Sequence, residues 1–138
     1  MDLQEIHEFF SPVRTIAVLG MSANPGRASY QVAQYMQQQG HIIVPVNPVY
    51  AGQNLLGCKC LPDLVSAAQV QQIDVVNCFR RADDLMQDLD AMLQVQAKMI
   101  WLQLGIINTE LAEIAQNKGI VVVMDKCLKI EHDLAFQA

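Results

Sequence analysis

The sequence predicts an α/β fold: a doubly wound parallel sheet of five strands with helices on both faces. Two observations carry this prediction. Short segments rich in Val and Ile alternate along the chain with segments of helical period, as in parallel sheets whose strands are joined by helices. The middle strand segments also lack alternating polar residues, which is expected when helices cover both faces of a sheet. Right-handed crossovers then leave few other topologies.

The expected elements follow from these patterns in chain order. The predicted strands cover residues 15–20, 42–46, 73–79, 99–102 and 120–124. The predicted helices cover residues 3–9, 30–39, 83–96 and 109–118, with a short helical turn over residues 61–68. Gly40 and Gly119 are placed as C-terminal stops of two of the helices.

Length and composition indicate one domain over residues 1–138. The chain is 52% hydrophobic, which supplies a single core and leaves no material for a second. Its formal net charge of −5 argues against a broad binding surface for nucleic acid. No apolar run approaches the roughly 20 residues that cross a bilayer. The acidic first residues lack the features of a secretory signal, so we expect a cytoplasmic protein.

Four cysteines raise the questions of metal binding and thiol chemistry. Cys58 and Cys60 are separated by one residue and have no second close Cys/His pair, so no metal site is expected. Cys78 ends an apolar segment and is expected in the core. Cys127 lies in a polar turn with two lysines nearby, which would favour its thiolate and leaves a reactive role open.

The ends of the predicted strands carry the residues with binding potential. In a doubly wound sheet, ligands bind beyond the carboxyl ends of the strands, where the winding direction reverses. The first strand runs into a loop of Gly, Ser, Asn and Pro just before a helix, an arrangement that suits a phosphate. This loop departs from the G-x-G-x-x-G spacing of dinucleotide-binding proteins, because Met21, Ser22 and Ala23 follow Gly20.

The end of the second predicted strand has no acidic residue. Nicotinamide-binding domains place Asp or Glu there to bind a ribose hydroxyl, whereas this chain reads Pro45-Val46-Asn47-Pro48. A neutral end is compatible with a ribose that carries a phosphate, because no carboxylate repels it. Coenzyme A and NADP both have such a ribose.

Five motifs in order resemble the stand-alone CoA-binding proteins, whose domain is similar to the N-terminal CoA-binding domain of the succinyl-CoA synthetase alpha subunit. The motifs lie at residues 20–30, 45–48, 74–81, 101–108 and 123–132. The resemblance covers nearly the whole chain and implies a Rossmann-like fold that binds CoA or an acyl-CoA.

The resemblance also implies a set of binding residues. They comprise a phosphate-binding loop (Gly20, Ser22, Asn24, Arg27 and Ser29), a border to the adenosine (Val46, Asn47 and Pro48), a strand end that flanks the nucleotide (Phe79, Arg80 and Arg81), a strand end along the pantetheine arm (Gln103, Leu104 and Gly105), and Lys126, where many relatives have Arg.

One position departs from the family pattern. Relatives commonly have Lys directly after the Asn-Pro pair, where this chain has Val49. The usual cation for the 3′-phosphate of CoA is then missing. Lys59, Arg80 or Arg81 would have to replace it, or the affinity for CoA is lower.

The function expected from these residues is non-catalytic binding or carriage of CoA or acyl-CoA. No Ser/His/Asp set, paired carboxylates or P-loop is visible, and His7, His41 and His132 are separated in the sequence. Three alternatives stay open: a small NADP-dependent oxidoreductase, a protein-interaction module with a vestigial nucleotide site, and a redox-linked CoA acceptor that forms a mixed disulfide at Cys127. A protein partner or a homo-oligomer is also compatible with the sequence.

Overall fold

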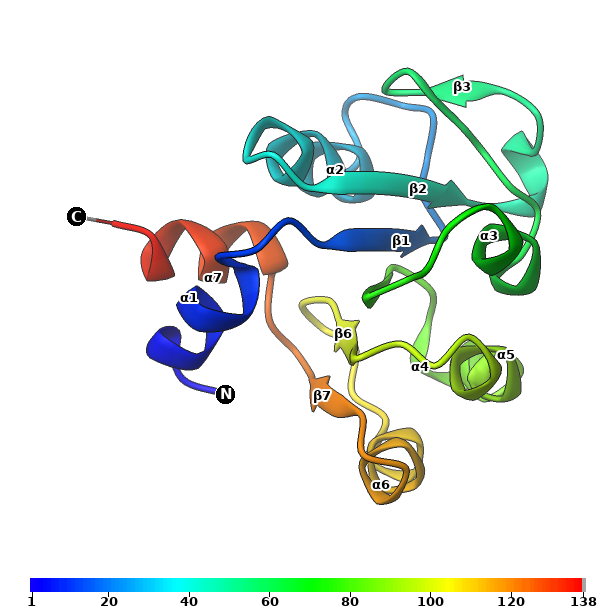
Figure 1. Cartoon of the computed structure of the whole chain (residues 1–138). Helices are drawn as coiled ribbons and strands as arrows, with labels where there is room; N and C mark the ends of the chain where they lie inside the picture. Colours follow the sequence, from blue (N-terminus) through cyan, green and yellow to red (C-terminus); the bar gives the residue numbers. More distant parts are fainter. Residues whose placement is uncertain (138) are drawn as a thin grey trace.

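The computed structural model describes residues 1–137 and contains a five-stranded parallel sheet in the order β2-β1-β5-β6-β7 (Figure 1). The strands are β1 (Thr15–Leu19), β2 (Ile42–Val46), β5 (Val75–Cys78), β6 (Met99–Leu102) and β7 (Val121–Val123), and β3 (Asn54–Leu55) pairs antiparallel with β4 (Cys58–Lys59). The helices are α1 (Leu3–Phe10), α2 (Ala28–Gln38), α3 (Leu64–Val70), α4 (Ala82–Leu85), α5 (Leu89–Gln94), α6 (Thr109–Asn117) and α7 (Leu128–Ala135), with one 3-10 turn, η1 (Pro48–Tyr50).

Helices cover both faces of this sheet, which confirms the predicted doubly wound, Rossmann-like fold. Helices α1, α2 and α7 lie on one face, and α3 to α6 lie on the other (Figure 1). Alternate residues of each central strand enter the two cores. In β1, Ile16 and Val18 pack toward α1 and α2, while Ala17 and Leu19 pack toward α3. This burial on both faces explains why the central strands carry no alternating polar residues.

The prediction of one continuous helix over residues 83–96 is wrong. This segment is split into α4 and α5 by a turn at residues 86–88. There the backbone N–H of Gln87 donates to Asp84 O at 3.2 Å, and that of Asp88 donates to Leu85 O at 2.9 Å. These three-residue bonds wind the chain more tightly than an α-helix does and redirect it before Leu89.

Three further elements were not predicted: the β3-β4 hairpin, the 3-10 turn η1 and α7. Each hairpin strand has only two residues, too few for an alternating pattern. The helical turn expected over residues 61–68 is α3, and it begins at Leu64 because the Asp63 side chain accepts a hydrogen bond from Ser66 N at 2.8 Å. The stops at Gly40 and Gly119 are confirmed, with φ of 96° and 82°.

Strand β2 forms one edge of the sheet, and this edge is partly closed. Pro45 has no N–H to offer to another strand, and its carbonyl oxygen accepts from Leu61 N at 3.0 Å. The Leu61 carbonyl in turn accepts from Asn47 N at 3.0 Å. The segment after the β3-β4 hairpin therefore occupies the carboxyl half of the β2 edge.

Candidate functional site

Two adjoining hollows lie at the carboxyl ends of β1, β2 and β5. They share Gly20, Asn47 and Phe79 in their linings and have volumes of about 360 and 370 Å³. Because the chain winds from β1 outward to β2 and then back across to β5, the point of reversal lies between β1 and β5. The cleft formed by the two hollows thus sits where doubly wound sheets bind their ligands.

The first wall of the cleft is the loop between β1 and α2, whose side chains hold its own backbone. Ser29 Oγ accepts from Ser22 N at 2.9 Å, Ser22 Oγ accepts from Asn24 N at 3.0 Å, and Asn24 Oδ1 accepts from Gly26 N at 2.9 Å. Ser22, Ser29 and Arg27 line the cleft, whereas Asn24 does not. The polar residues of the loop therefore fix its shape before any ligand binds.

Helix α2 starts at this loop without a side-chain cap. Arg27 occupies the N-cap position and makes no capping hydrogen bond, so the first N–H groups of α2 remain available near Ala28 and Ser29, which line the cleft. Backbone N–H groups and the positive end of the helix dipole favour an anion at this place. Arg27 adds a positive side chain to the same wall.

Asn47 and Gly20 join the first loop to the neighbouring strand ends. Asn47 Nδ2 donates to Met21 O at 3.0 Å, and its Oδ1 accepts from Val49 N at 3.0 Å. Gly20 N donates to Val46 O at 2.8 Å, and its φ is 85°. These bonds fix the floor of the cleft, and the side chain of Asn47 keeps one N–H and one acceptor lone pair that a ligand could use.

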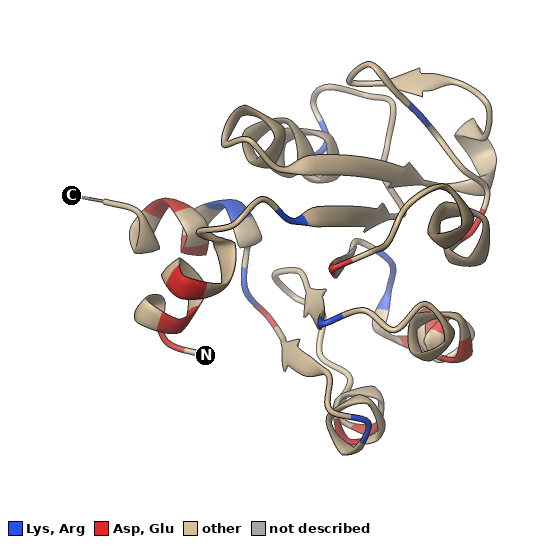
Figure 2. Ribbon diagram, in the orientation of Figure 1, with Lys and Arg blue, Asp and Glu red and all other residues tan. Residues whose placement is uncertain are grey.

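Arg80 and Arg81 supply positive charge on the second wall, in the segment before α4 (Figure 2). Their side chains differ in exposure and in partner. Arg81 is 86% exposed, and its Nε lies 3.3 Å from Asp84 Oδ2. Arg80 is 32% exposed, and its Nε lies 3.3 Å from Asp88 Oδ2. Burial raises the pKa of Asp88, and the positive charge of Arg80 opposes this shift.

Three cations were considered as substitutes for the lysine that is missing at position 49, and the structure places them at different sites. Val49 lines the cleft and is 74% exposed. Lys59 lines a different groove, along β2 with Ile42 and Val70, whereas Arg80 and Arg81 line the cleft. Among these three cations, only the two arginines are therefore placed to meet a ligand there.

Tyr50 is a cleft residue that sequence reasoning missed. It closes the 3-10 turn η1 and lines the first hollow beside Val49. The signal was an aromatic residue just after the Asn47-Pro48 strand end. An aromatic ring at this place offers a surface on which a nucleotide base can stack.

The residues predicted to follow the pantetheine arm lie at the neighbouring strand ends and do not line these two hollows. Gln103 is buried, and its Oε1 accepts from Asn77 Nδ2 at 3.2 Å and from Leu128 N at 3.1 Å. Asn77 Oδ1 is buried without a partner among residues 1–137. Leu104 is exposed, and Gly105 N donates to Asp125 Oδ1 at 2.7 Å.

Lys126 follows the last strand, and its backbone carbonyl group has a structural role. Its carbonyl oxygen accepts from the indole N–H of Trp101 at 2.8 Å, while its Nζ lies 4.0 Å from Glu131 Oε1. The Trp101 ring is fully buried. The turn before α7 is thus tied to the carboxyl end of β6.

The four cysteines are free thiols. Cys78 is fully buried, which confirms its place in the core, and burial raises the pKa values of Cys58 and Cys60. Cys127 is half-buried at the N-cap position of α7. Within residues 1–137, no group of three or more His, Cys, Asp or Glu residues is arranged to hold a metal ion.

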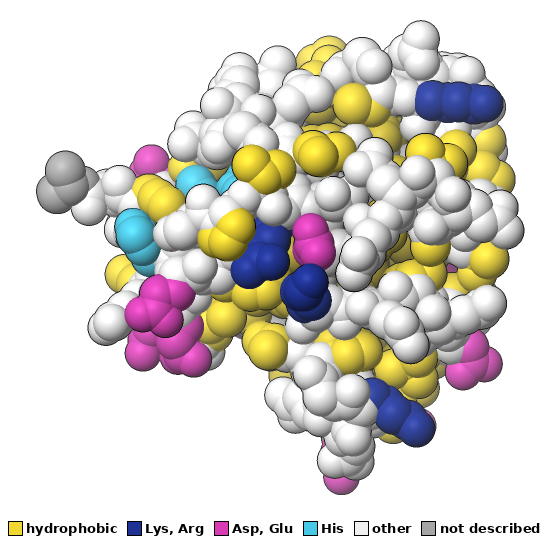
Figure 3. Space-filling model, in the orientation of Figure 1, with side chains coloured by type: hydrophobic (Ala, Val, Ile, Leu, Met, Phe, Trp, Pro, Cys, Tyr) yellow, Lys and Arg dark blue, Asp and Glu magenta, His cyan; other side chains and the backbone are white. Residues whose placement is uncertain are grey.

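Outside the cleft, the structure brings together the three histidines that are far apart in the sequence. His7 of α1, His41 before β2 and His132 of α7 meet near Tyr35 of α2. Figure 3 shows histidine side chains gathered on this part of the surface. The Tyr35 hydroxyl and His132 Nδ1 are hydrogen-bonded at 2.9 Å, and His41 Nδ1 accepts from Arg14 N at 3.0 Å. This histidine cluster lies at the amino ends of β1 and β2, away from the cleft.

No helix in the described part of the chain combines the length and apolar character that a membrane crossing requires.

Known proteins resemble this chain over almost its full length. A Bacillus subtilis protein described as uncharacterized, YneT, is 37% identical over 128 residues, which span 93% of this chain and 92% of that protein. The solved structure of the cell-free ID.343 protein from Thermus thermophilus superposes with a TM-score of 0.94 at 34% identity and covers 99% of this chain and 100% of that one. A hypothetical protein from Pyrococcus horikoshii gives a TM-score of 0.91 at 28% identity, with 99% and 94% covered.

A family model described as "CoA binding domain" also matches residues 14–133. The matched range contains both walls of the cleft, from the loop after β1 to the segment before α4. The chain therefore belongs to the CoA binding domain family.

Proposed function

We propose that the protein binds coenzyme A or an acyl-CoA in the cleft at the carboxyl ends of β1, β2 and β5, and that it binds or carries this ligand without catalysis. One observation supports the proposal above all others: the uncapped start of α2 and Arg27 meet at the point where the winding of the sheet reverses. This combination of free N–H groups, helix dipole and arginine suits a phosphate group.

The lining of the cleft suggests where each part of the ligand binds. The diphosphate fits at the loop between β1 and α2, beside Arg27. The adenosine fits against Tyr50 and the end of β2, where no carboxylate lines the hollow to repel a ribose phosphate. From there the pantetheine arm would run toward the end of β6 and Leu104, whose apolar side chain is exposed.

A non-catalytic role is supported by what lines the cleft. Among the described residues that line the two hollows there is no His, Cys or Lys, and the sole carboxylate is that of Asp84, which pairs with Arg81. A general base or an activated nucleophile needs such groups within hydrogen-bond reach. The same lining offers no pair of groups suited to hydride transfer from NADP.

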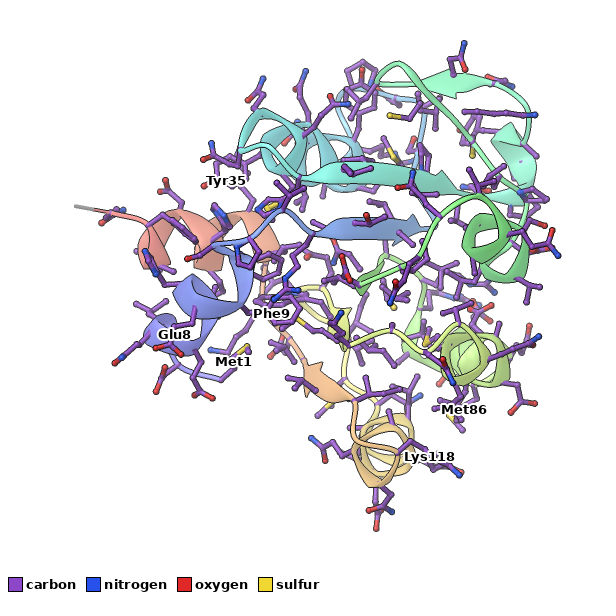
Figure 4. The ribbon with its side chains drawn as sticks, viewed as in Figure 1. Met1, Glu8, Phe9, Tyr35, Met86 and Lys118 are labelled. Carbon is purple, nitrogen blue, oxygen red and sulfur yellow. The ribbon has the colours of Figure 1, made fainter. Side chains whose placement is uncertain are left out.

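Isothermal titration tests the proposal with CoA, 3′-dephospho-CoA, NADP and NAD at one salt concentration. We expect CoA to bind most tightly and Arg27→Gln to weaken it about tenfold or more, since a charge-assisted bond to phosphate is lost. Lys118→Gln removes the same charge from the end of α6, away from the cleft, and should leave binding unchanged (Figure 4).

Two results would contradict the proposal. Tighter binding of NADP than of CoA would favour the oxidoreductase alternative. Absence of saturable binding by all four ligands would favour an interaction module with a vestigial nucleotide site.

A further inference from the structure

The turn that divides α4 from α5 brings a carboxylate next to Arg80, on the second wall of the cleft. We propose that Asp88 is a positioning residue that holds the Arg80 guanidinium in place to bind a phosphate group of the ligand. This inference rests on the proposed function and adds to it a specific anion-binding pair.

The geometry of the pair suits such a role. Asp88 Oδ2 lies 3.3 Å from Arg80 Nε, and the Asp88 side chain is 19% exposed. Arg80 lines the cleft, whereas Asp88 does not. The carboxylate therefore attracts the guanidinium on its Nε side by charge, and neither Nη group of Arg80 donates a hydrogen bond to a residue of the described chain. Those two groups form the edge that binds phosphate in a bidentate manner.

The stem of Arg80 is fixed as well as its charged end. A Cβ atom built on Gly20 would lie 3.2 Å from Arg80 Cγ, so the stem passes directly over the end of β1. An arginine held at both places loses less side-chain entropy when it binds an anion. Arg81 also has a carboxylate partner, since its Nε donates to Asp84 Oδ2 at 3.3 Å, but its side chain is 86% exposed, whereas that of Arg80 is 32% exposed.

Helix capping and fold stability do not account for Asp88. Asp88 precedes α5, yet its side chain makes no capping hydrogen bond. Its Oδ2 is buried and has no hydrogen bond of good geometry within residues 1–137, since the contact with Arg80 Nε is an ion pair of poor alignment. Burying a carboxylate with an imperfect partner costs stability, and burial raises the pKa of this carboxyl group. A gain in ligand binding explains why an acid stands there.

The proposal predicts a specific pattern of binding constants. Asp88→Asn keeps the shape of the side chain and removes its charge, so Arg80 is held less firmly and CoA should bind about tenfold more weakly by isothermal titration. Asp88→Glu should recover part of the loss, because it restores the charge. Asp90→Asn removes the same charge from an exposed position two residues later, within α5, and should leave binding unchanged.

A double-mutant cycle separates positioning from a general structural effect. If Asp88 acts through Arg80, then Asp88→Asn should cause no further loss in a chain that already carries Arg80→Gln. Thermal unfolding of each variant checks that the fold is retained. The inference is overturned if the loss from Asp88→Asn is the same in both backgrounds. It is also overturned if Asp88→Asn tightens binding, which would mean that Asp88 restrains Arg80 away from the ligand.

A parallel titration with inorganic pyrophosphate distinguishes this inference from the proposed function. Pyrophosphate binding that depends on both Arg80 and Asp88, in a protein that does not bind CoA, would support the anion-binding pair and contradict the proposed ligand. Binding of CoA with no dependence on Asp88 would support the proposed function and overturn the pair. Failure of the unsubstituted protein to bind either compound would overturn both.

Discussion

Gly20 stands at the point where the end of β1, the backbone of Phe79 and the stem of Arg80 come closest together. Its φ of 85° lies in the region that side chains disfavour, and a Cβ atom there would lie 3.2 Å from Arg80 Cγ and 3.5 Å from Phe79 C. The missing side chain thus serves both the turn into the first loop and the placement of Arg80.

We expect Gly20→Ala to lower the free energy of unfolding by about 1–2 kcal/mol, because of backbone strain, and to weaken CoA binding by displacing Arg80. Gly119→Ala is a matched control: its φ is 82°, and a Cβ atom there meets nothing within 4 Å. Urea unfolding and calorimetric titration should show a stability loss in both variants and a binding loss in Gly20→Ala alone. Equal binding losses would show that Gly20 has no specific part in the cleft.

At the scale of elements, α7 connects the two ends of the sheet. Its first residue, Leu128, donates its N–H to Gln103 at the carboxyl end of β6, and His132 one turn later belongs to the histidine cluster at the amino ends of β1 and β2. The helix also packs against α1 (Figure 1). Burial, with a contribution from His41, lowers the pKa of His132 to about 4.

This shift makes the protein less stable in mild acid. Between pH 6.5 and about 4 the unfolded chain takes up a proton at His132 that the folded chain does not, so the free energy of unfolding falls as the pH falls. The loss from this one group is about 3 kcal/mol and ends below pH 4, where both states are protonated. The lowered pKa of His41 acts in the same direction.

Urea unfolding at several pH values checks this expectation, with His132→Gln as the comparison. The variant cannot titrate at this position, and its stability should decline less steeply between pH 6.5 and 4. Parallel curves for the two proteins would show that folding does not lower the pKa of His132.

The elements also show what could be predicted from the sequence and what could not. Helices α1, α2 and α6 were predicted because each has a periodic apolar face and a recognisable start or stop. The break at residues 86–88 was missed, since its residues are compatible with a continuous helix and tertiary packing decides the bend. Helix α7 buries only Leu128 and His132, too few to give a period.

The candidate site was predictable to a similar degree. Gly20, Asn47 and Arg80 stand next to strand ends, so local sequence placed them near the cleft. Asp88 could not be found in this way, because its relation to Arg80 depends on a turn that the sequence pattern does not indicate. The histidine cluster was missed for the same reason: its members come from three separate elements.

At the scale of the whole molecule, the central sheet supports two cores that share every strand. Trp101 is the single tryptophan, and it lies fully buried in the core that α1, α2 and α7 cover. Ile100 and Leu102, its neighbours in β6, enter the other core. Each strand contributes side chains to both cores. Loss of one core therefore removes packing from the strands on which the other core also depends.

We therefore expect residues 1–138 to unfold as one cooperative domain. Tryptophan fluorescence reports the environment of Trp101, and far-ultraviolet circular dichroism reports the helices on both faces. The two urea transitions should coincide, with a slope of about 1–3 kcal/mol per molar urea. Separate midpoints would show that the two faces melt independently and that the chain is not a single cooperative unit.

The two edges of the sheet differ in the backbone hydrogen-bonding groups that they leave open. This difference limits how copies of the chain could associate. On β2, Pro45 has no donor, and the pairing of Leu61 with Pro45 and Asn47 already uses the neighbouring backbone groups. A foreign strand cannot extend the sheet in register along that half of β2. Strand β7 is the other end of the strand order, and Val121 there is 42% exposed. Growth of the sheet by strand addition, whether into a dimer or an aggregate, is thereby directed to β7.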